Sequence, residues 1–341
     1  MVAPRASPRA INTDSTLPAA AYLGGAEGRL DPQETQAFWI PETINITVRR
    51  SRGTWSPTIV YQRPDVARLL VGQHASIALN RVRVIHSACG FAHQIAFARA
   101  SEAAGLSHIE IAGRRTARNL RIVLEIAAAH AHRAALELAP ACDRPPAIAE
   151  LKTLMDAIAT ATRVVDGADS TSDNDSYRRQ LAVAFEDVEQ AARSLLSSVP
   201  PGPPKHLFGQ LSPETRGFVA AGWRRPWRFM ARMTPVLSRS GLSRQVDIPR
   251  SANGRLLDVG LGKAATSRGL LNYEVAFHDG AVTHCKVCTP TMRMTAPGGS
   301  LSFHLSHLPA SRDTELLAGL VILASDPCAP TRVHFVERAH A

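Results

Sequence analysis

The sequence predicts a mainly α-helical protein with small antiparallel β elements. Hydrophobic residues make up 45% of the 341 positions and charged residues 20%, which is the balance of a globular chain that buries a substantial core. Apolar residues recur with helical spacing through the middle of the chain, whereas strict alternation of apolar and polar residues is confined to two short segments, one near each end.

The N-terminal segment is expected to stay outside this fold. Residues 1–40 contain no apolar core of the kind found in secretory signals, and they are predicted to form a disordered tail. No apolar run approaches the roughly 18 residues of a membrane span. We therefore expect a cytoplasmic protein without a membrane span.

The first half of the ordered chain begins with a predicted hairpin. "INITVRRSRGTWSPTIV", residues 44–60, alternates apolar and polar residues around Arg-Gly. A helical pattern then runs from about 64 to 140, where Leu120, Leu124 and Ala127 share one helix face. The prolines of "ELAPACDRPP" end that pattern.

Two more helices are predicted at about 146–165 and 176–197. The polar stretch between them, "DGADSTSDNDS", predicts a flexible loop over about 166–176. The stretch "SSVPPGPPKH" predicts a Pro-rich linker over about 198–206, which its prolines hold extended.

The last third predicts a hairpin followed by an apolar helix. Leu271, Tyr273, Val275 and Phe277 alternate up to Asp279-Gly280, a sequence typical of a tight hairpin turn. "TELLAGLVILASDPC" then reads as an apolar helix that Asp-Pro ends.

The formal charge of +10 comes largely from arginine. Residues 216–244 carry seven arginines and no acidic residue. Such a segment is either a solvated arginine-rich surface, which we favour, or a site for an anionic partner. No nucleic-acid-binding motif accompanies it, so no nucleic-acid partner is expected.

The five cysteines are expected to be free thiols, because their number is odd and no secretion signal precedes them. Cys285 and Cys288 form a C-x2-C sequence, but they fall in the return strand of the predicted hairpin. Residues three apart on a strand point to opposite faces, so a structural role is predicted for both. A zinc or redox site at this pair is the alternative. Cys142 lies in a Pro-rich turn without a neighbouring ligand.

Two other cysteines carry weaker patterns that gain weight together. Cys89 and His93 are spaced i, i+4 at the start of a predicted helix, so both project from one face, and the helix dipole there favours a thiolate. Cys328 lies in "SDPCAPTRVHF", with His334 six residues later. Each pattern alone is weak: spacing alone favours a structural role for Cys89 and His93 over a metal site, and Asp-Pro before Cys328 simply makes a turn.

Together the two patterns resemble the metal-binding motifs of [NiFe] hydrogenase large subunits. "RVIHSACGFAH" resembles their R-x-C-G-x-C-x3-H motif, with His86 at the first cysteine and Cys89 at the second. "DPCAPTRVH" resembles their D-P-C-x2-C-x2-H motif, with Cys328 at the first cysteine, Thr331 at the second and His334 at the histidine. In that family the four cysteines hold nickel and an Fe(CN)2CO unit.

Two further segments resemble the same family. "SRGLLNYEVAFHDGAVTHCKVCTPT" is similar to the segment whose arginine and hydroxyl residue approach the diatomic ligands of the iron; the matches are Arg268 and Thr291, while Ala265 stands in place of the usual acidic residue. "RRTARNLRIVLEIAAAHAHRAALELAP" resembles the long helix after the first motif. The resemblance covers about residues 64–140 and 255–338.

A large-subunit-like chain with half of the cysteines resembles the HupK-type hydrogenase expression/formation proteins. This resemblance implies a large-subunit-like fold, with residues 41–341 in a single domain so that Cys89 and Cys328 can meet. It also implies a non-catalytic role in hydrogenase maturation, as a scaffold that holds the Fe(CN)2CO unit transiently and without nickel. The implied partners are a small maturation chaperone and the hydrogenase large-subunit precursor. A divergent large subunit with residual catalysis is the alternative function.

The resemblance assigns roles to five residues. Cys89 and Cys328 would hold the iron, because soft thiolates suit an iron whose other positions are filled by CO and cyanide. Arg268 would offset negative charge, and Thr291 would donate a hydrogen bond to a cyanide nitrogen. His86 is either a nitrogen ligand or a packed residue. His93 and His334 are expected to orient a ligand or to be structural, and the remaining motif-free histidines, His130, His132, His304 and His307, to lie on the surface or in packing.

Overall fold

The structure is a computed structural model that describes residues 42–51, 54–86, 89–106, 115–167, 175–238, 254–256 and 259–337. The predicted tail over 1–40 and most of the predicted loop over 166–176 lie outside these residues, so both stay predictions, as does the single domain over 41–341.

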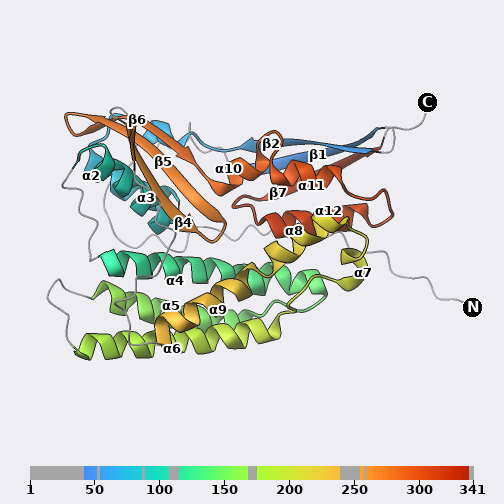
Figure 1. Cartoon of the computed structure of the whole chain (residues 1–341), viewed down its shortest axis with the longest axis horizontal. Coiled ribbons are helices and arrows are strands. Elements are labelled where there is room, and N and C mark those ends of the chain that lie inside the picture. The colour runs from blue at the N-terminus through green and yellow to red at the C-terminus, as the bar shows by residue number, and fades with distance from the viewer. Residues whose placement is uncertain are drawn as a thin grey trace, which may run out of the picture.

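The described elements follow one another as helices framed by strands (Figure 1). The strands are β1 Thr43–Ser51, β2 Thr54–Gln62, β3 Gly254–Leu256, β4 Val259–Thr266, β5 Gly269–His278, β6 Ala281–Cys288 and β7 Thr331–Glu337. The helices are η2 Val66–Leu69, α2 Ala75–Ile85, α3 Gly90–Ala103, α4 Arg115–Arg133, η3 Ala134–Leu138, η4 Pro140–Cys142, α5 Ile148–Asp166, α6 Asp175–Ser198, α7 Lys205–Phe208, α8 Pro213–Trp223, α9 Arg225–Ser238, α10 Pro290–Thr295, α11 Ser300–Ser306 and α12 Thr314–Ser325.

The predicted N-terminal hairpin is confirmed as part of a three-stranded sheet with the order β2-β1-β7. β1 and β2 pair antiparallel, and Ile44, Ile46 and Val48 turn their side chains into the core. β7, which the sequence pattern did not reveal, pairs parallel to β1. This pair brings the last described strand beside the first. Because it is parallel, the prediction of purely antiparallel β elements is corrected.

The second predicted hairpin is confirmed and extended into a four-stranded antiparallel sheet, β3-β4-β5-β6. Asp279 and Gly280 form its turn with φ of 49° and 76°, the left-handed pair that a tight hairpin needs. β4 packs directly on α3, because a Cβ on Gly262 would lie 2.1 Å from the Ala96 carbonyl oxygen. Glycine at this position therefore fixes how closely the sheet approaches the helix.

The predicted orientation of the C-x2-C pair is confirmed. Cys285 lies opposite Val275 and is buried, whereas Cys288 lies opposite Asn272 on the other face of β6. The two thiols are separated by the sheet itself, and neither supports the other as a ligand.

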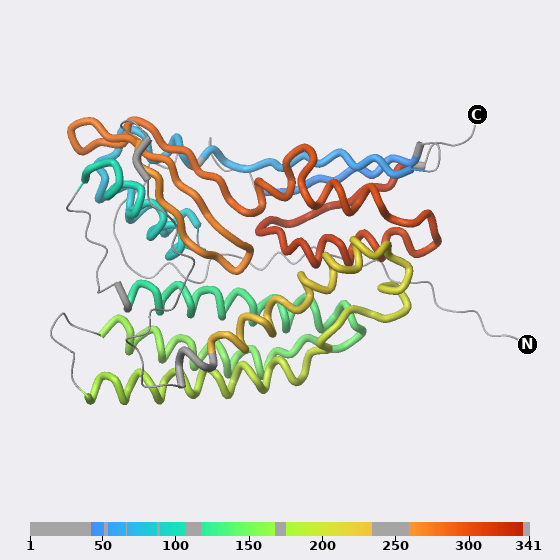
Figure 2. Tube along the Cα trace, viewed as in Figure 1, coloured from blue at the N-terminus to red at the C-terminus, as the bar shows by residue number. Residues whose placement is uncertain are grey.

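The helices α4, α5 and α6 run alongside one another, and α9 crosses in front of them in the view of Figures 1 and 2, in contact with α4 and α6. The apolar side chains of α6 recur at Leu181, Phe185, Val188, Ala192 and Leu195, so one face of the helix is buried. The predicted helices over 146–165 and 176–197 are confirmed. Val199 to Pro204 form no helix or strand, and they bend at Val199, Pro201 and Gly202 rather than run extended as predicted.

Two buried clusters make up the described core, and α4 joins them. Leu120 and Leu124 belong to the cluster around α4, α5 and α6, whereas Ile122 and Ile126 belong to the cluster between α3 and the four-stranded sheet. α4 therefore lies between the part of the chain that carries the first motif and the part that carries the last. Within the described residues, no helix has the length and apolar character needed to cross a membrane.

Candidate metal-binding site

The structure brings the two motif cysteines together although they lie 239 positions apart. Cys89 is the N-cap of α3, and Cys328 follows the turn that ends α12. Cys328 is near enough to raise the pKa of Cys89, and Arg268 is near enough to lower the pKa of both thiols. Cys89, Cys328 and Arg268 are therefore neighbours in one partly buried site.

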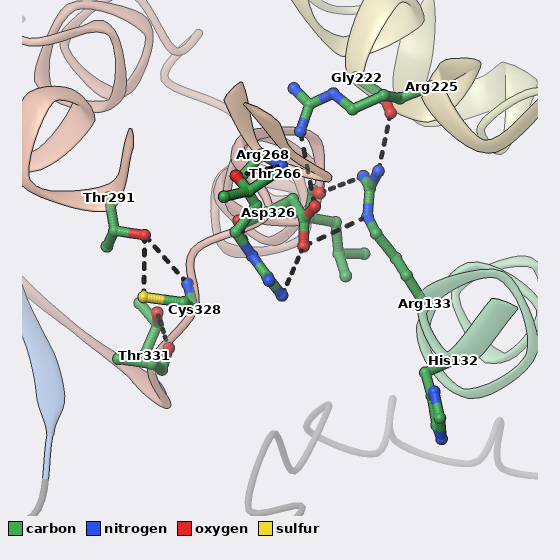
Figure 3. A network of polar contacts seen from close by, with 12 residues as sticks. His132, Arg133, Gly222, Arg225, Thr266, Arg268, Thr291, Asp326, Cys328 and Thr331 are labelled. Carbon is green, nitrogen blue, oxygen red and sulfur yellow. Dashed lines mark hydrogen bonds and ion pairs between the residues drawn. The ribbon is translucent and has the colours of Figure 1, made fainter. Parts of the chain in front are cut away.

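The turn that carries Cys328 is fixed by Asp326. Asp326 caps α12 in the left-handed region with φ 55°, a conformation that aspartate tolerates better than most residues. The Thr291 hydroxyl donates to the Cys328 sulfur at 3.0 Å and accepts from the Cys328 backbone N–H at 3.2 Å (Figure 3). Thr291 thus touches Cys328 directly, as its predicted place in the site requires.

Three arginines surround the buried carboxylate of Asp326 (Figure 3). Nη2 of Arg268 lies 3.3 Å from Oδ1, Nη1 of Arg225 lies 3.5 Å from Oδ2, and Nε of Arg133 lies 3.8 Å from Oδ1. Nε of Arg268 also donates to the Asp326 carbonyl oxygen at 2.9 Å. Glu137 contributes a second carboxyl beside Arg133 and Arg268, and desolvation raises its pKa, so the three guanidinium groups outnumber the carboxyl groups of this cluster.

Arg133 anchors this cluster to the helices. Its Nη1 donates to the Gly222 carbonyl oxygen at 2.9 Å and its Nη2 to the Leu323 carbonyl oxygen at 2.5 Å. α8 and α12 meet backbone to backbone here, since a Cβ on Gly222 would lie 2.3 Å from the Ala324 carbonyl oxygen. A single buried side chain from α4 therefore holds both helices and the turn before Cys328.

The segment that carries Cys89 is fixed by Glu125 and Gly90. The Glu125 carboxylate accepts from the backbone N–H groups of Phe91 at 2.8 Å and Ala92 at 3.1 Å, so α4 caps the first turn of α3. A Cβ on Gly90 would lie 2.3 Å from the Arg83 carbonyl oxygen, so only glycine fits after Cys89. Burial raises the pKa of Glu125 to about 7, against the lowering effect of the two backbone N–H groups.

His86 and His93 stack on each other beside Cys89, with ring centroids 3.5 Å apart. Nδ1 of His93 lies 2.8 Å from the Tyr273 hydroxyl, so a buried contact fixes the orientation of the His93 ring. Nε2 of His86 is buried, and the described residues offer it no hydrogen-bond partner. Burial, then Arg63, lowers the pKa of His86 to about 3, so the ring is neutral and retains a lone pair.

The prediction that the helix dipole favours a thiolate at Cys89 is wrong. Burial, followed by the charges of Glu125 and Cys328, raises the pKa of Cys89 to about 12. Burial and Glu42 also raise the pKa of Cys328, which Thr291 and Arg268 oppose. Desolvation outweighs the helix terminus, and both sulfurs are protonated near neutral pH in this structure.

Glu42 and Tyr61 belong to the site but were missed in the sequence, as were Glu125 and Arg133. The Tyr61 hydroxyl donates to the Glu42 carboxylate, and the Cys328 sulfur lies 3.7 Å from the Tyr61 hydroxyl and 3.9 Å from Glu42 Oε1. Both come from the ends of the N-terminal hairpin. No sequence signal linked that hairpin to Cys328, because the parallel pairing of β7 with β1 is what brings them together.

His334 does not belong to the site, and the expectation that it orients a ligand or packs structurally is wrong. It lies on β7 opposite Thr47, and its side chain is exposed, whereas Val333 and Phe335 pack on the core. Strand alternation turns residue 334 away from the buried face on which Thr331 lies. The other histidines behave as expected: His130 and His304 are buried in packing and His132 and His307 lie at the surface.

Among the described residues, no three His, Cys, Asp or Glu side chains are grouped closely enough to form a complete metal-binding set. What the site offers is two soft sulfur donors, excess positive charge and one unused imidazole nitrogen. Such a donor set suits a thiophilic metal that brings most of its own ligands.

Similarity to solved structures shows that the fold is that of a [NiFe] hydrogenase large subunit. A NAD+-reducing [NiFe]-hydrogenase in the H2-reduced state matches with a TM-score of 0.53 at 11% identity, over 81% of this chain and 94% of that chain. The reduced Ni-Fe-Se hydrogenase from D. vulgaris Hildenborough matches with a TM-score of 0.51 at 12% identity, over 82% and 94%. The reduced, active Ni-Fe-Se hydrogenase from Desulfomicrobium baculatum matches with a TM-score of 0.51 at 12% identity, over 82% and 95%.

One curated protein adds similarity in sequence. The chain is 39% identical over 82 residues to the hydrogenase expression/formation protein HupK of Rhodobacter capsulatus, a match that spans 24% of this chain and 26% of that protein. The match thus covers about a quarter of the relative's length. No family model matches the chain. The predicted relationship, a HupK-like chain with a large-subunit fold, is confirmed by the two kinds of similarity.

Proposed function

We propose that this chain is a non-catalytic accessory protein of [NiFe] hydrogenase maturation, which holds the Fe(CN)2CO unit before the unit passes to the hydrogenase large-subunit precursor. The observation that carries the proposal is the convergence of Cys89 and Cys328 beside Arg268 on a large-subunit fold. The partial similarity to a hydrogenase formation protein supports the maturation role.

Two sulfurs suit a holding site better than four would. A site of four thiolates would bind a metal pair almost irreversibly, whereas two thiolates can hold one iron that is otherwise occupied by CO and cyanide. His86 and Thr331 stand where the other two cysteines of the hydrogenase motifs would be. The chain therefore lacks the donors for nickel, and no nickel is expected.

Binding requires the two thiols to lose their protons. Metal binding favours the thiolate, so cargo and protons compete for the same sulfurs. The Glu42 carboxylate, 3.9 Å from the Cys328 sulfur, is placed to accept the proton of that thiol. The excess positive charge of the arginine cluster would offset the charge of the thiolates and cyanides.

The remaining residues would orient the cargo. Thr291 donates to the Cys328 sulfur in this structure, and its hydroxyl can turn to a cyanide nitrogen when the thiol ionises. His86 presents the unused Nε2, which would complete the donor set with a nitrogen. The alternative for His86 is a packed ring that stabilises His93 by stacking.

The partners follow from the holding role. A scaffold must receive its cargo and release it, so we propose contacts with a small maturation chaperone and with the hydrogenase large-subunit precursor in the cytoplasm. A divergent hydrogenase with residual turnover is the second candidate, because the similar solved structures are enzymes.

Metal analysis of protein purified without oxygen from a hydrogenase-producing host separates the candidates. The scaffold predicts about one iron per chain, no nickel and no hydrogen turnover. Nickel together with iron and measurable hydrogen turnover would establish the divergent hydrogenase, and zinc alone would contradict both candidates. Metal-free protein that still restores hydrogenase activity to a host lacking it would contradict the holding role.

A further inference from the structure

An arginine row lies along the outer side of α9 and the residue that precedes it. Arg224, Arg228 and Arg232 are spaced i, i+4, i+8, and the backbone N–H of Arg228 bonds the Arg224 carbonyl oxygen at 2.9 Å, so the helical path continues through all three. All three side chains are exposed. Successive guanidinium groups start about 6 Å apart along the helix, at 1.5 Å per residue.

The arginine row contributes no described contact to the fold. Within the described part of the chain, none of its three side chains has an ion pair or hydrogen bond, whereas the neighbouring Arg225 turns inward to Asp326. The buried side chains of α9, Met230 and Met233, pack on the core without it. Like charges at i, i+4 repel each other, so the row costs the isolated helix a small amount of stability.

We propose that the arginine row binds an acidic α-helical segment of a partner protein, one that presents carboxylates at one-turn spacing. Carboxylates at i, i+4, i+8 on such a helix recur every 6 Å or so, which matches the row, and each bidentate guanidinium–carboxylate pair would relieve the repulsion between the arginines. The formal charge of +10 would speed the encounter. This inference goes beyond the holding role and does not depend on it.

The described surroundings favour a protein partner over a membrane or a nucleic acid. Insertion into a lipid surface needs large exposed apolar residues in the same face, but among the described side chains of residues 224–233 Trp227 and Phe229 are partly buried against the core and the exposed Ala231 is small. α6 packs beside α9 and exposes Glu186 and Asp187, which would repel any anionic partner, phosphate backbone or acidic helix, that extended across both helices. The row therefore suits a narrow partner that lies along it alone, as a single acidic helix can.

The test uses the full chain and four defined probes. The first is a short labelled helical peptide with glutamates at i, i+4, i+8 on one face, and the second has the same composition with its glutamates spread around the helix. A single-stranded oligonucleotide and vesicles of anionic lipid are the third and fourth. Fluorescence anisotropy for the three soluble probes and sedimentation for the vesicles give affinities at low and moderate salt.

The variants are matched in charge. Arg224→Glu, Arg228→Glu and Arg232→Glu together reverse the row, and the control reverses Arg49, Arg312 and Arg332, which are exposed elsewhere. We expect the wild type to bind the one-face peptide more tightly than the other probes. The row variant should lose at least about tenfold in affinity and the control less than about threefold.

Three outcomes overturn the inference. Equal losses in both triple variants would show that net charge alone attracts the peptide. Tighter binding of the oligonucleotide or the vesicles would assign the row to a different class of partner. Equal affinity for the two peptides would show that the spacing of the row is irrelevant. Circular dichroism of each variant confirms that all comparisons are made on folded protein.

Discussion

In two cysteine pairs of this chain, separation along the sequence and proximity in the fold run opposite to each other. Cys285 and Cys288 are three residues apart and point to opposite faces of β6. Cys89 and Cys328 are 239 positions apart and meet beside Arg268. The near pair is separated by strand alternation, and the distant pair is joined by the packing of α3 and α12 around α4.

The comparison shows that short cysteine spacing indicates a site only where the backbone turns. A C-x2-C sequence converges at a tight turn or a helix start, but on a strand its sulfurs diverge. Cys89 lies at a helix start and Cys328 follows a left-handed turn, so each projects from the end of an element into the same space.

The largest effect is expected at the distant pair. Cys89→Ser and Cys328→Ser should each abolish iron retention, and the double variant should be no worse than either, because a single thiolate holds too little and the two act as a unit. Bound iron and restored hydrogenase activity are measured together. The matched control is Cys285→Ser with Cys288→Ser, which should retain iron at wild-type level.

A loss of iron in the control double variant as great as in the site variants would reverse the assignment of the two pairs. Normal hydrogenase maturation by both site variants would show that the sulfurs no longer hold cargo. Soluble yield and thermal unfolding of every variant distinguish loss of metal from loss of fold.

The next largest effect is expected in the turn that places Cys328. Asp326→Asn should lower the free energy of unfolding by about 3–5 kcal/mol, because the buried Arg133 and the partly exposed Arg225 and Arg268 lose their shared carboxylate. Asp143→Asn is the control, since Asp143 also has positive φ but is exposed. Urea unfolding should show little change for the control, about 0.5 kcal/mol or less.

If the two asparagine variants unfold alike, the backbone conformation rather than the arginine cluster holds the turn. Arg133→Met separates these contributions further, because it removes the bonds to Gly222 and Leu323 but leaves Asp326 charged.

An effect of intermediate size is expected on the pH dependence of stability at His130, which is buried and lies close enough to Arg133, Arg225 and Arg268 for their charges to lower its pKa. Burial, followed by the charges of Arg133 and Arg225, lowers the pKa of His130 to about 3 from its ordinary value of 6.5. Its contribution to stability is therefore complete above about pH 6.5 and is lost as the pH falls toward 3, by up to about 1.4 kcal/mol per pH unit. At pH 5 the loss from His130 reaches about 2 kcal/mol.

Urea unfolding of wild type and His130→Gln between pH 5 and 8 measures this contribution. The variant should show a shallower decline below pH 6.5, with the remaining decline due to the other buried histidines, His86 and His93. Parallel curves for the two proteins would show that His130 does not titrate with a lowered pKa.

The smallest effect is expected at the near pair taken singly. Cys285→Ser puts a hydroxyl in the core beside Val275 and should cost about 1–2 kcal/mol of unfolding free energy, whereas the half-buried Cys288→Ser should cost about 0.5 kcal/mol or less. A cost for Cys288→Ser that exceeds that for Cys285→Ser would show that the two faces of β6 are assigned the wrong way round.

The sequence predicted those helices and turns whose formation depends on residues close together in the chain. Helical spacing located α5 and α6, and Asp279-Gly280 located the turn between β5 and β6, because burial periodicity and turn chemistry act within a few residues. β4 was missed since Gly260 and Gly262 interrupt its apolar alternation, and those glycines are explained only by the approach of α3.

The sequence predicted only the site residues that belong to short motifs, and not those that distant segments contribute. The motifs named Cys89, Cys328, Arg268 and Thr291, and the last three are joined by direct or shared contacts. Glu42 and Tyr61 reach Cys328 only through the pairing of β7 with β1, a long-range contact that no short pattern encodes. The raised pKa of Cys89 likewise follows from burial by distant elements, which outweighs the local helix dipole.

Infrared spectroscopy of the protein purified without oxygen from a hydrogenase-producing host tests the holding role most directly. Metal-bound CO and cyanide absorb in a region free of protein bands, so the spectrum reports the cargo itself rather than its effect on hydrogenase. The wild type and the Cys285/Cys288 double serine variant should both show CO and cyanide bands with iron and without nickel, and Cys89→Ser and Cys328→Ser should show none. If the CO and cyanide bands persist in both single serine variants, Cys89 and Cys328 do not form the site. If the wild type matures hydrogenase but contains no iron and shows no such bands, the holding role is contradicted.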